Sequence, residues 1–349
     1  MRLAGKEKRV PVSVQFELTP RCNFDCKMCY VHNETSNQMK DKELSTEQWI
    51  RIFDEAYDCG MMFATLTGGE CLLRDDFVEL YLHLWKKRVF VSVFTNGALI
   101  NDEYITFFKK YLPDTIRISL YGSSNAGYRN VTGHSGYEKV LDNVRKLLVA
   151  GINVELAVTP SKYIADDYIN TLLCAHKTGA YLTLSEMMLI EKRDDPESTD
   201  HFLTADEIVK LSIEQAQLFF NIEGVSETPE PCGKCQIPPK GLTCNAGNGF
   251  ANVLWDGKIY PCGNIMVGGF SMLEMSFAEA WEKVKAAADA VIRPVECVDC
   301  PYDSVCPRCM AYRWTSLNSG HCNTAVCDIT RKLVAAGVKK LEQPAETCD

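Results

Sequence analysis

The feature that most constrains the fold is a regular alternation of short apolar runs and longer amphipathic stretches between Val12 and Leu189. The runs are rich in β-branched and aromatic residues, as strands are, and the stretches between them have the length of helices. Parallel strands require crossovers of about a dozen residues or more, so the alternation predicts a parallel sheet with helices on its faces. The six predicted strands are VSVQFELT, FATLTGG, VFVSVFTN, TIRISLYG, INVELAVTP and YLTLSEMML.

Right-handed crossovers curl such a sheet towards a partial (β/α)6 barrel, so we expect an α/β fold of this kind. Ligands of parallel α/β folds bind at the carboxyl ends of the strands. Polar residues follow three of the predicted strands, at Thr67 to Glu70, at Thr95 and Asn96, and at Ser119 to Gly122. The sequence therefore predicts a binding site at this end of the barrel.

The composition argues against several classes of protein. The net charge is -9 at pH 7 and the basic residues form no long run, so a nucleic-acid partner is not expected. No stretch approaches the roughly 18 apolar residues of a membrane span and no signal peptide is found, so we expect a cytoplasmic protein with no membrane partner. Because the cytosol keeps thiols reduced, the 17 cysteines favour metal ligation over disulfides.

Three cysteines, Cys22, Cys26 and Cys29, stand directly after the first predicted strand with the spacing C-x-x-x-C-x-x-C. Three thiolates this close can cap one face of a cubane cluster and leave the fourth iron open to a ligand. The alternatives are a zinc site that lacks one ligand, a redox pair, or an electron-transfer cluster whose fourth cysteine is remote. The position at the end of the first strand favours a cofactor site.

This spacing, followed by the aromatic residue Tyr30, resembles the signature of the radical SAM superfamily. The segment Thr67-Gly68-Gly69-Glu70 resembles the GGE segment of that family, in which glycines let the backbone approach the methionyl moiety and the acid receives its ammonium group. The resemblance also implies that three further polar residues contact the ribose, amine or carboxylate of S-adenosylmethionine (SAM). These residues are Asn96, Ser119 and Arg129. The alternative for each is that it only satisfies backbone groups near a strand end.

The chemistry that the resemblance implies comes from the cofactors. A reduced 4Fe-4S cluster donates one electron to SAM, and the resulting 5'-deoxyadenosyl radical abstracts a hydrogen atom, while the protein orients the reactants. The electron comes from a reductant such as a flavodoxin or ferredoxin. The sequence does not identify a catalytic acid or base; Tyr121, Glu155 and Glu186 are candidates only through their expected places near strand ends.

A second group of cysteines fills the end of the chain, with 11 cysteines from Cys232 onward. Their order resembles the SPASM domain, which holds two auxiliary 4Fe-4S clusters, so we expect three clusters in total. The alternative for four closely spaced thiols, those of Cys297, Cys300, Cys306 and Cys309, is a zinc knuckle. The resemblance implies the ligands Cys244, Cys262 and Cys309, with Cys235 or Cys232, for the first auxiliary cluster, and Cys297, Cys300 and Cys306, with Cys327 or Cys322, for the second. The spacing from Cys306 to Cys309 is one residue shorter than is usual for the family, and some relatives leave the first auxiliary cluster open.

The alternation of strands and helices stops at the charged stretch EKRDDPESTD, and an amphipathic helix is predicted over Thr204 to Phe220. We therefore expect a barrel over residues 1–200, a bridging region over 201–243, a SPASM-like module over 244–335 and a tail over 336–349. The module is expected to be a small iron-sulfur domain of irregular or α+β type.

The resemblance implies a substrate class as well. Enzymes with this domain pair mostly modify peptides, so we expect maturation of a ribosomally made peptide by a thioether or carbon–carbon crosslink. Epimerisation of a peptide and oxidation of a small carbohydrate-like substrate are the alternatives. Sulfatase-maturating relatives carry an aspartate where this sequence has Gly263, which argues against that activity. A non-catalytic zinc or iron-sulfur scaffold is the alternative of another class.

Overall fold

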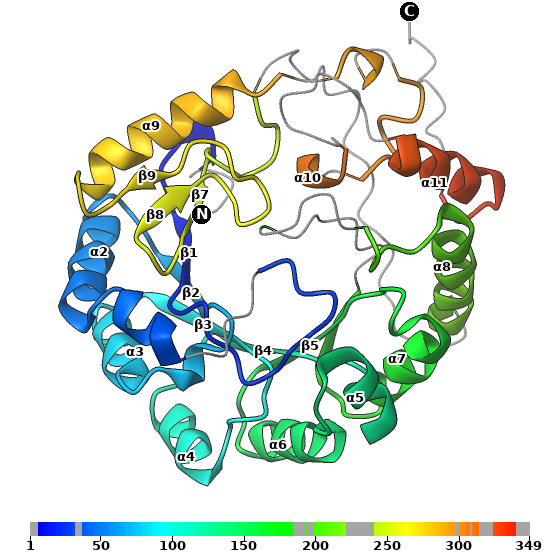
Figure 1. Cartoon of the computed structure of the whole chain (residues 1–349), viewed down its shortest axis with the longest axis horizontal. Coiled ribbons are helices and arrows are strands. Elements are labelled where there is room, and N and C mark those ends of the chain that lie inside the picture. Colours follow the sequence, from blue (N-terminus) through cyan, green and yellow to red (C-terminus); the bar gives the residue numbers. More distant parts are fainter. Residues whose placement is uncertain are drawn as a thin grey trace, which may run out of the picture. The chain divides into compact units, whose positions relative to one another are not determined.

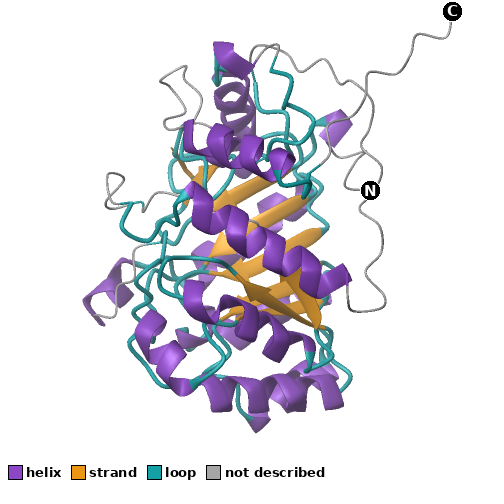
Figure 2. Ribbon diagram, turned by 90° about the vertical axis from the view of Figure 1, so that its right-hand side faces the viewer, coloured by secondary structure: helices purple, strands orange, loops and turns teal. Residues whose placement is uncertain are grey.

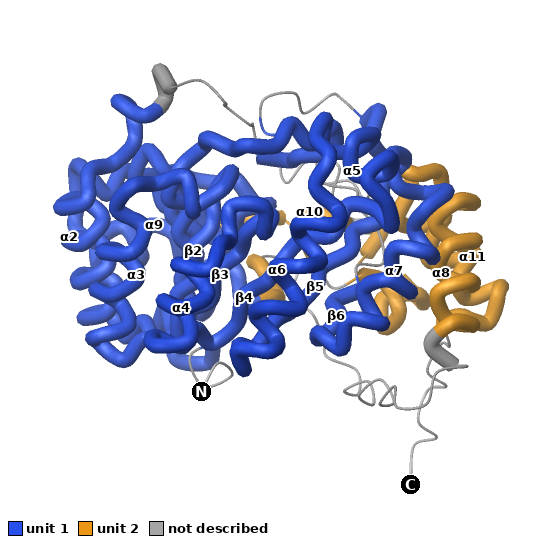
Figure 3. The backbone as a smooth tube through the Cα atoms, turned by 90° about the horizontal axis from the view of Figure 1, so that it is seen from below, with its two compact units in different colours: residues 1–202, 245–289 blue, residues 203–244, 290–349 orange. Residues whose placement is uncertain are grey.

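The computed structural model describes residues 6–31, 37–184, 193, 199–220, 241–292, 294–297, 300–307, 309–313 and 324–339. The chain forms two compact units, shown in different colours in Figure 3. Unit 1 comprises residues 1–202 and 245–289, and unit 2 comprises residues 203–244 and 290–349. The domain boundaries expected from the sequence stay a prediction beside this division.

Unit 1 is built on a sheet with the strand order β6-β5-β4-β3-β2-β1-β7-β8-β9 (Figure 1). The strands from β6 to β7 are parallel, and β8 and β9 are added in antiparallel pairing. The sheet does not close, so the predicted α/β partial barrel is confirmed. The strands are β1 Ser13–Glu17, β2 Phe63–Thr67, β3 Phe90–Thr95, β4 Thr115–Ser119, β5 Val154–Val158, β6 Tyr181–Leu184, β7 Phe250–Val253, β8 Lys258–Tyr260 and β9 Phe270–Ser271.

Helices cover the outer face of this sheet (Figures 1 and 2). The first of these helices, α2, has the sequence pattern of a helix that packs on a sheet. Ser45 and Gln48 form a capping box at its start, and its buried residues recur at helical spacing. One of these, Phe53, packs edge-on against Phe16 of β1 with 4.7 Å between the ring centroids. The helices of unit 1 are α2 Thr46–Asp58, α3 Phe77–Lys86, α4 Asp102–Lys110, α5 Asn125–Thr132, α6 Tyr137–Val149, α7 Tyr168–His176 and α9 Phe277–Ala290, with 3-10 turns η1 Asn37–Lys42, η2 Cys71–Leu73 and η3 Ala165–Asp167.

The two faces of the strands differ in character because side chains alternate along a strand. One set is apolar and fully buried, as Phe16 and Ile118 are. The other set is half-buried and largely polar, and it faces the concave side of the sheet, which we call the lumen. Polar lumen residues include Gln15, Thr65, Ser92, Arg117 and Glu155.

Unit 2 contains α8 Ala205–Phe220, η4 Val295–Cys297, α10 Met310–Arg313 and α11 Thr324–Ala335. Thr204 and Glu207 form a capping box at the start of α8, so the predicted helix is confirmed to within one residue. Helices α8 and α11 pack together, with Ile208 and Ile329 fully buried. No helix in the described part of the chain is long and apolar enough to cross a membrane.

Candidate active site at the carboxyl ends of the strands

The loop that follows β1 carries Cys22, Cys26 and Cys29. It is held in place by backbone hydrogen bonds, because the N–H groups of Asp25 and Lys27 donate to the last turn of α5 over 3.0 Å each. Within the loop, the N–H of Cys29 donates to the carbonyl of Cys26 over 2.9 Å. The second and third cysteines therefore lie on one tight turn.

A buried ion-pair network fixes the start of this loop. Arg21, the residue before the first cysteine, donates from Nε to Glu43 Oε1 over 2.6 Å and from Nη2 to Glu43 Oε2 over 3.1 Å. Arg74 reaches the same carboxylate over 3.2 Å and donates to the carbonyl of Leu18 over 3.1 Å. The side chains of both arginines and of Glu43 are less than a tenth exposed, so the network is shielded from solvent.

The electrostatics of the loop suit a cationic cluster. Burial raises the pKa of Cys22 to about 11. The pKa of Cys26 lies well above its usual value because of burial and because Cys29 and Cys22 are close enough to repel a third thiolate. Bound metal stabilises the thiolate form of cysteine, so one buried and two half-buried cysteines whose thiolates would repel one another fit a group that supplies positive charge.

The geometry bears on the zinc alternative too. Among the described residues, no three metal-binding side chains converge on one point as the ligands of a single ion do. The ligands of a 4Fe-4S cluster bind different irons and need not converge. Cys22, Cys26 and Cys29 as the ligands of a cluster stay a prediction.

Gly68 and Gly69 bring the end of β2 against this loop. The N–H of Gly69 donates to the carbonyl of Thr19, and the N–H of Glu70 to that of Arg21, over 2.8 Å each. A Cβ atom on Gly68 would lie 2.4 Å from the carbonyl oxygen of Thr19, and one on Gly69 would lie 2.3 Å from that of Arg21. Both positions require glycine because the backbone passes too close for a side chain.

The carboxylate of Glu70 joins the ends of β2 and β3. It is fully buried and accepts hydrogen bonds from the hydroxyl of Thr95, from the backbone N–H of Asn96 over 2.8 Å and from that of Leu72 over 3.1 Å. Burial raises the pKa of Glu70, although these hydrogen bonds act in the opposite direction. The Nδ2 of Asn96 lies 3.8 Å from the sulfur of Cys22. Predicted residues from three strand ends thus lie together.

The other predicted cofactor-binding residues differ in their surroundings. Ser119 lies at the end of β4, near half-buried Tyr121, which in turn lies near Cys26. Arg129 is exposed on α5 and donates to Ser135. The structure therefore places Ser119 beside the cysteine loop, whereas Arg129 points into solvent, and both remain predictions as SAM ligands.

Sequence reasoning missed a buried ion pair at the end of β1. Glu17 is 1% exposed and forms two hydrogen bonds of 2.6 and 2.8 Å with Arg193, which also donates to the carbonyl of Gly263 over 2.7 Å. The backbone N–H of Arg193 donates to the carbonyl of Tyr30 over 3.0 Å, so this residue ties the cysteine loop to the segment after Cys262. A carboxylate in an apolar strand was a signal for Glu17; Arg193 stands in a charged stretch and gave none.

The same pair explains the glycine at position 263. A Cβ atom there would lie 3.2 Å from Arg193 Nη2 and 3.4 Å from Glu17 Oε1. A larger acidic side chain would also place a second carboxylate beside that of Glu17. The space next to Cys262 is already filled by the ion pair, which is consistent with the absence of an aspartate.

The predicted auxiliary ligands fall in both units. Cys262 belongs to unit 1 and makes an antiparallel bridge with Ile265. In unit 2, burial raises the pKa of Cys309, and the nearby Cys244 adds to this effect, so these two thiols lie close together. Cys232, Cys235, Cys322 and Glu186 lie outside the described residues. The remaining predicted ligands are Cys297 at the end of η4, Cys300 and Cys306 in the turns that follow, and Cys327 on α11.

Three known proteins are similar to this chain over more than half of its length. The chain is 25% identical over 326 residues to the AdoMet-dependent heme synthase of Methanosarcina barkeri, covering 86% of this chain and 91% of that protein. It is 26% identical to the PqqA peptide cyclase of Granulibacter bethesdensis, covering 79% and 75%. The sporulation killing factor maturation protein SkfB of Bacillus subtilis is 28% identical, but the match covers 60% of this chain and only half of SkfB.

Two solved structures share the fold. Streptococcus suis SuiB, solved bound to its precursor peptide SuiA, superposes with a TM-score of 0.66 at 15% identity over 93% of this chain and 79% of SuiB. The enzyme anSMEcpe with bound AdoMet gives a TM-score of 0.70 at 16% identity over 94% and 97%. Residues 16–173 match the family model of the radical SAM superfamily. Residues 16–173 of this chain therefore form a radical SAM domain, and the chain is an enzyme.

Proposed function

We propose that this enzyme matures a ribosomally made peptide by forming a thioether or carbon–carbon crosslink. The observation that carries the proposal is the set of relatives: SkfB is a maturation protein and the PqqA enzyme is a peptide cyclase. SuiB, which shares the fold, has been solved with a precursor peptide. A small-molecule substrate is the second candidate, since the heme synthase is similar over most of this chain.

The family implies SAM and a 4Fe-4S cluster as cofactors. When bound, they supply a 5'-deoxyadenosyl radical that abstracts a hydrogen atom from the substrate. The residues of this chain hold and orient the reactants: Cys22, Cys26 and Cys29 would bind the cluster. Gly68, Gly69 and Glu70 fix the adjacent backbone, and Asn96 and Ser119 offer polar groups to SAM. A flavodoxin or ferredoxin is the proposed reductant.

Two auxiliary 4Fe-4S clusters complete the proposal. Cys244, Cys262 and Cys309, with Cys235 or Cys232, are proposed for the first, and Cys297, Cys300 and Cys306, with Cys327 or Cys322, for the second. The closeness of Cys244 and Cys309 in unit 2 supports this grouping. About twelve irons per chain are expected after anaerobic reconstitution, from three clusters of four.

Two measurements test the proposal. Replacement of Cys22, Cys26 and Cys29 by Ala should abolish the 5'-deoxyadenosine formed from SAM and a reductant and should lower the iron content by about four per chain. A non-catalytic scaffold would form no 5'-deoxyadenosine even with the native cysteines. Cleavage of SAM that survived the triple replacement would contradict the assignment of the cluster.

The substrate class is tested by mass spectrometry of a short peptide encoded beside the gene, incubated with enzyme, SAM and a reductant. A loss of two hydrogens is expected for a crosslink. Deuterium uptake from heavy water without that loss would indicate epimerisation instead. An unchanged peptide would favour a small-molecule substrate.

A further inference from the structure

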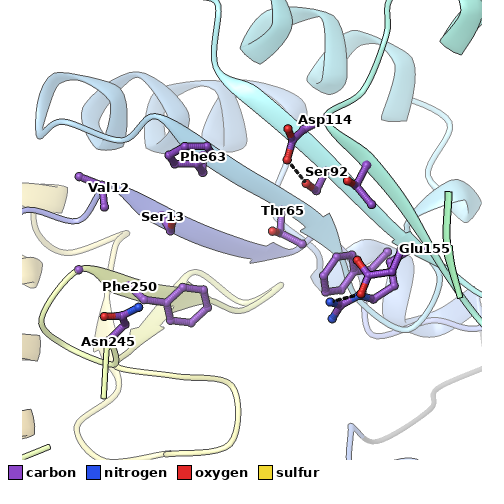
Figure 4. A pocket seen from close by; sticks show the side chains of 13 residues that line it. Val12, Ser13, Phe63, Thr65, Ser92, Asp114, Glu155, Asn245 and Phe250 are labelled. Carbon is purple, nitrogen blue, oxygen red and sulfur yellow. Dashed lines mark hydrogen bonds and ion pairs between the residues drawn. The ribbon is translucent and has the colours of Figure 1, made fainter. Parts of the chain in front are cut away.

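The lumen contains a cavity of about 290 Å³ near the amino-terminal end of β1, where Ser13 lines it (Figure 4). Its wall holds an ion pair, in which Arg117 donates from Nη2 to Glu155 Oε1 over 2.5 Å. These two charges neutralise each other, so the pair does not call for a charged ligand. Unpaired cations lie instead on the outer surface of unit 1, at the ends of α3 and α4.

The carboxyl-terminal ends of α3 and α4 lie side by side (Figures 1 and 3). The ring of Trp85 packs edge-on against that of Tyr111 with 5.1 Å between the centroids, and Lys110 Nζ lies 5.1 Å from the centroid of the Tyr111 ring. Trp85 remains 37% exposed and Leu112 54% exposed. The residues that we call the α3–α4 surface are Trp85, Lys86, Arg88, Lys110, Tyr111 and Leu112.

The cations of the α3–α4 surface are not balanced by acids. Lys86, Arg88 and Lys110 are exposed, and none of them forms an ion pair with a described residue. Lys87 differs, since it pairs with Asp54 over 2.9 Å. Because the chain as a whole has a net charge of -9, a group of unpaired cations indicates a negatively charged partner.

The backbone at Arg88 is a second, independent observation. Arg88 has a φ of +62°, and its N–H donates to the carbonyl of Trp85, three residues back, over 2.9 Å. The same turn closes α2 and α6, where the residue is Gly60 or Gly151. Glycine adopts this left-handed conformation without strain, whereas arginine does not. The arginine lowers the stability of the fold, so a role in binding is expected for its side chain.

The helix dipole explains only part of this surface. Cations near the carboxyl end of a helix are favourable, which accounts for Lys86 and Lys110. The dipole does not account for an exposed tryptophan, or for an arginine where glycine would relieve the backbone. Tryptophan and arginine are enriched at the centres of protein interfaces, so the surface fits a polypeptide partner.

The charge of the whole chain limits the size of this partner. A membrane surface or a nucleic-acid duplex is extended, so it would also meet the excess negative charge of the chain. A short acidic segment covers only the α3–α4 surface, and at physiological salt the exposed charges more than about 8 Å away are screened from it.

The position of the surface argues against the reductant as the partner. Arg88 stands two residues before β3, at the amino-terminal end of the sheet, whereas the cysteine loop follows the carboxyl end of β1. The six residues of β3 span about 20 Å, and β1, β2 and β3 are parallel. An electron donor bound here would be far from the three cysteines, but a peptide bridges this distance with about six or more extended residues.

We propose that the α3–α4 surface binds an acidic recognition segment of the peptide substrate, apart from the residues that the radical modifies. Carboxylates of this segment pair with Lys86, Arg88 and Lys110, and an apolar side chain between them packs on Trp85 and Leu112. The inference rests on the proposed peptide substrate, and it names the part of the peptide that the enzyme recognises.

Three labelled hexapeptides test the specificity of the surface on the full-length, reconstituted enzyme. The first has two leucines between two pairs of glutamates, the second has glutamines in place of the glutamates, and the third has serines in place of the leucines. In fluorescence anisotropy titrations, the first should bind about tenfold more tightly than the second and about threefold more tightly than the third. Its affinity should fall severalfold between about 0.05 M and about 0.5 M salt. Equal binding of all three peptides, or no binding of the first, would overturn the proposal.

Arg88→Gly separates binding from folding. It should weaken binding of the glutamate peptide about threefold and raise the melting temperature by about 2 °C, because the left-handed backbone is relieved. Lys110→Gln should weaken binding by a similar factor, whereas Lys177→Gln, the same replacement at the exposed carboxyl end of α7, should leave it unchanged. Undiminished binding by both Arg88→Gly and Lys110→Gln would refute the assigned surface.

Anionic vesicles distinguish a membrane from a peptide as the partner. Cosedimentation with vesicles of equal parts phosphatidylglycerol and phosphatidylcholine should be no greater for the native enzyme than for Arg88→Gly. Vesicle binding that Arg88→Gly abolished would assign the surface to lipid headgroups and overturn the proposal.

Formation of 5'-deoxyadenosine in the same samples separates this inference from the proposed function. If SAM is cleaved but the glutamate and glutamine peptides bind alike, the docking surface is wrong and the radical chemistry stands. If the glutamate peptide is preferred by an enzyme that does not cleave SAM, and Arg88→Gly weakens this preference, the docking surface stands and the proposed function fails.

Discussion

At the scale of single residues, the site depends on how closely two backbone segments approach each other. Gly68 has a φ of +143° and faces the carbonyl of Thr19, and Gly69 faces that of Arg21. The two glycines therefore allow β2 to continue its hydrogen bonding into the loop that carries Cys22. Gly68 and Gly69 therefore have a structural role in the protein even without SAM, in addition to any contact with SAM.

Gly68→Ala should be severely destabilising because the new Cβ would lie 2.4 Å from a backbone oxygen. We expect a loss of about 3 kcal/mol or more in the free energy of unfolding, from overpacking and from the unfavourable φ together. Gly179→Ala is the matched control, since Gly179 has a φ of +78° but no atom within 4 Å of its Cβ position. It should cost only about 1 kcal/mol. Similar losses in urea denaturation of both variants would contradict the steric explanation.

Glu17→Gln removes one partner of a buried ion pair and leaves Arg193 without its counter-charge. The expected loss is about 3 kcal/mol in the free energy of unfolding. Asp142→Asn breaks the exposed pair with Lys146 on α6 and should cost less than about 1 kcal/mol. Thermal unfolding of the two variants compares them, and a Glu17→Gln variant as stable as the control would show that the pair contributes little.

At the scale of the elements, the six strands of the barrel were predictable from the sequence. The second partner of β1, strand β7, was not. Runs such as TIRISLYG and INVELAVTP alternate around β-branched residues, so they identify β4 and β5 from local pattern alone. The pairing of Ser13 with Phe250 joins segments 237 residues apart, and no local pattern encodes it. For the same reason, the sequence indicated the GGE segment but not its hydrogen bonds to Thr19 and Arg21.

The residues of the candidate site also differ in how far the sequence predicts their positions. The cysteine spacing places three thiols on one loop, because their separation along the chain is short. Glu17, Arg193 and Gly263 meet only through the tertiary fold. Glu17 stands out as a carboxylate in an apolar strand, but nothing in the sequence indicates Arg193 as its partner. Arg117 shows the limit most clearly, since its unsatisfied Nε depends on which side chains of the neighbouring strands face the lumen.

Helices α2 and α3 are joined at their amino-terminal ends by Asp76, which accepts hydrogen bonds from Arg74 and, over 2.6 Å, from Thr46. Burial raises the pKa of Asp76, but these hydrogen bonds outweigh it and the pKa lies below its usual value. The carboxylate therefore stabilises the fold above its unfolded pKa of about 3.9, and this contribution is lost as the pH falls through the lower, folded value.

Asp76→Asn should reduce the loss of stability that the protein shows as the pH falls. The free energy of unfolding, measured by urea titration at about pH 6 and about pH 3, should fall less in the variant than in the native enzyme. The variant should also be less stable at the higher pH, since the ion pair with Arg74 is removed. Parallel pH profiles for the two proteins would exclude a role for Asp76 in acid unfolding.

At the scale of the whole molecule, the division into two units predicts separable stabilities. Ile329→Ala removes a fully buried side chain between α8 and α11 and should destabilise unit 2 by about 2 to 5 kcal/mol. Amide hydrogen exchange should become faster in peptides of α8, while peptides of β2 to β4 stay protected. Ile118→Ala in β4 should show the reverse pattern. Equal acceleration in both units would indicate one cooperative unit.

The place of β7 beside β1 has a consequence for synthesis on the ribosome. The first strand leaves the exit tunnel early, but the strand that covers its free edge is made 237 residues later. At ordinary elongation rates this delay is roughly 12 to 50 s. During that interval the edge of β1 presents unpaired N–H and C=O groups that other nascent chains can pair with. Chaperones therefore have to protect this edge until β7 has been made, whereas β2 and α5, which hold the cysteine loop, are made long before.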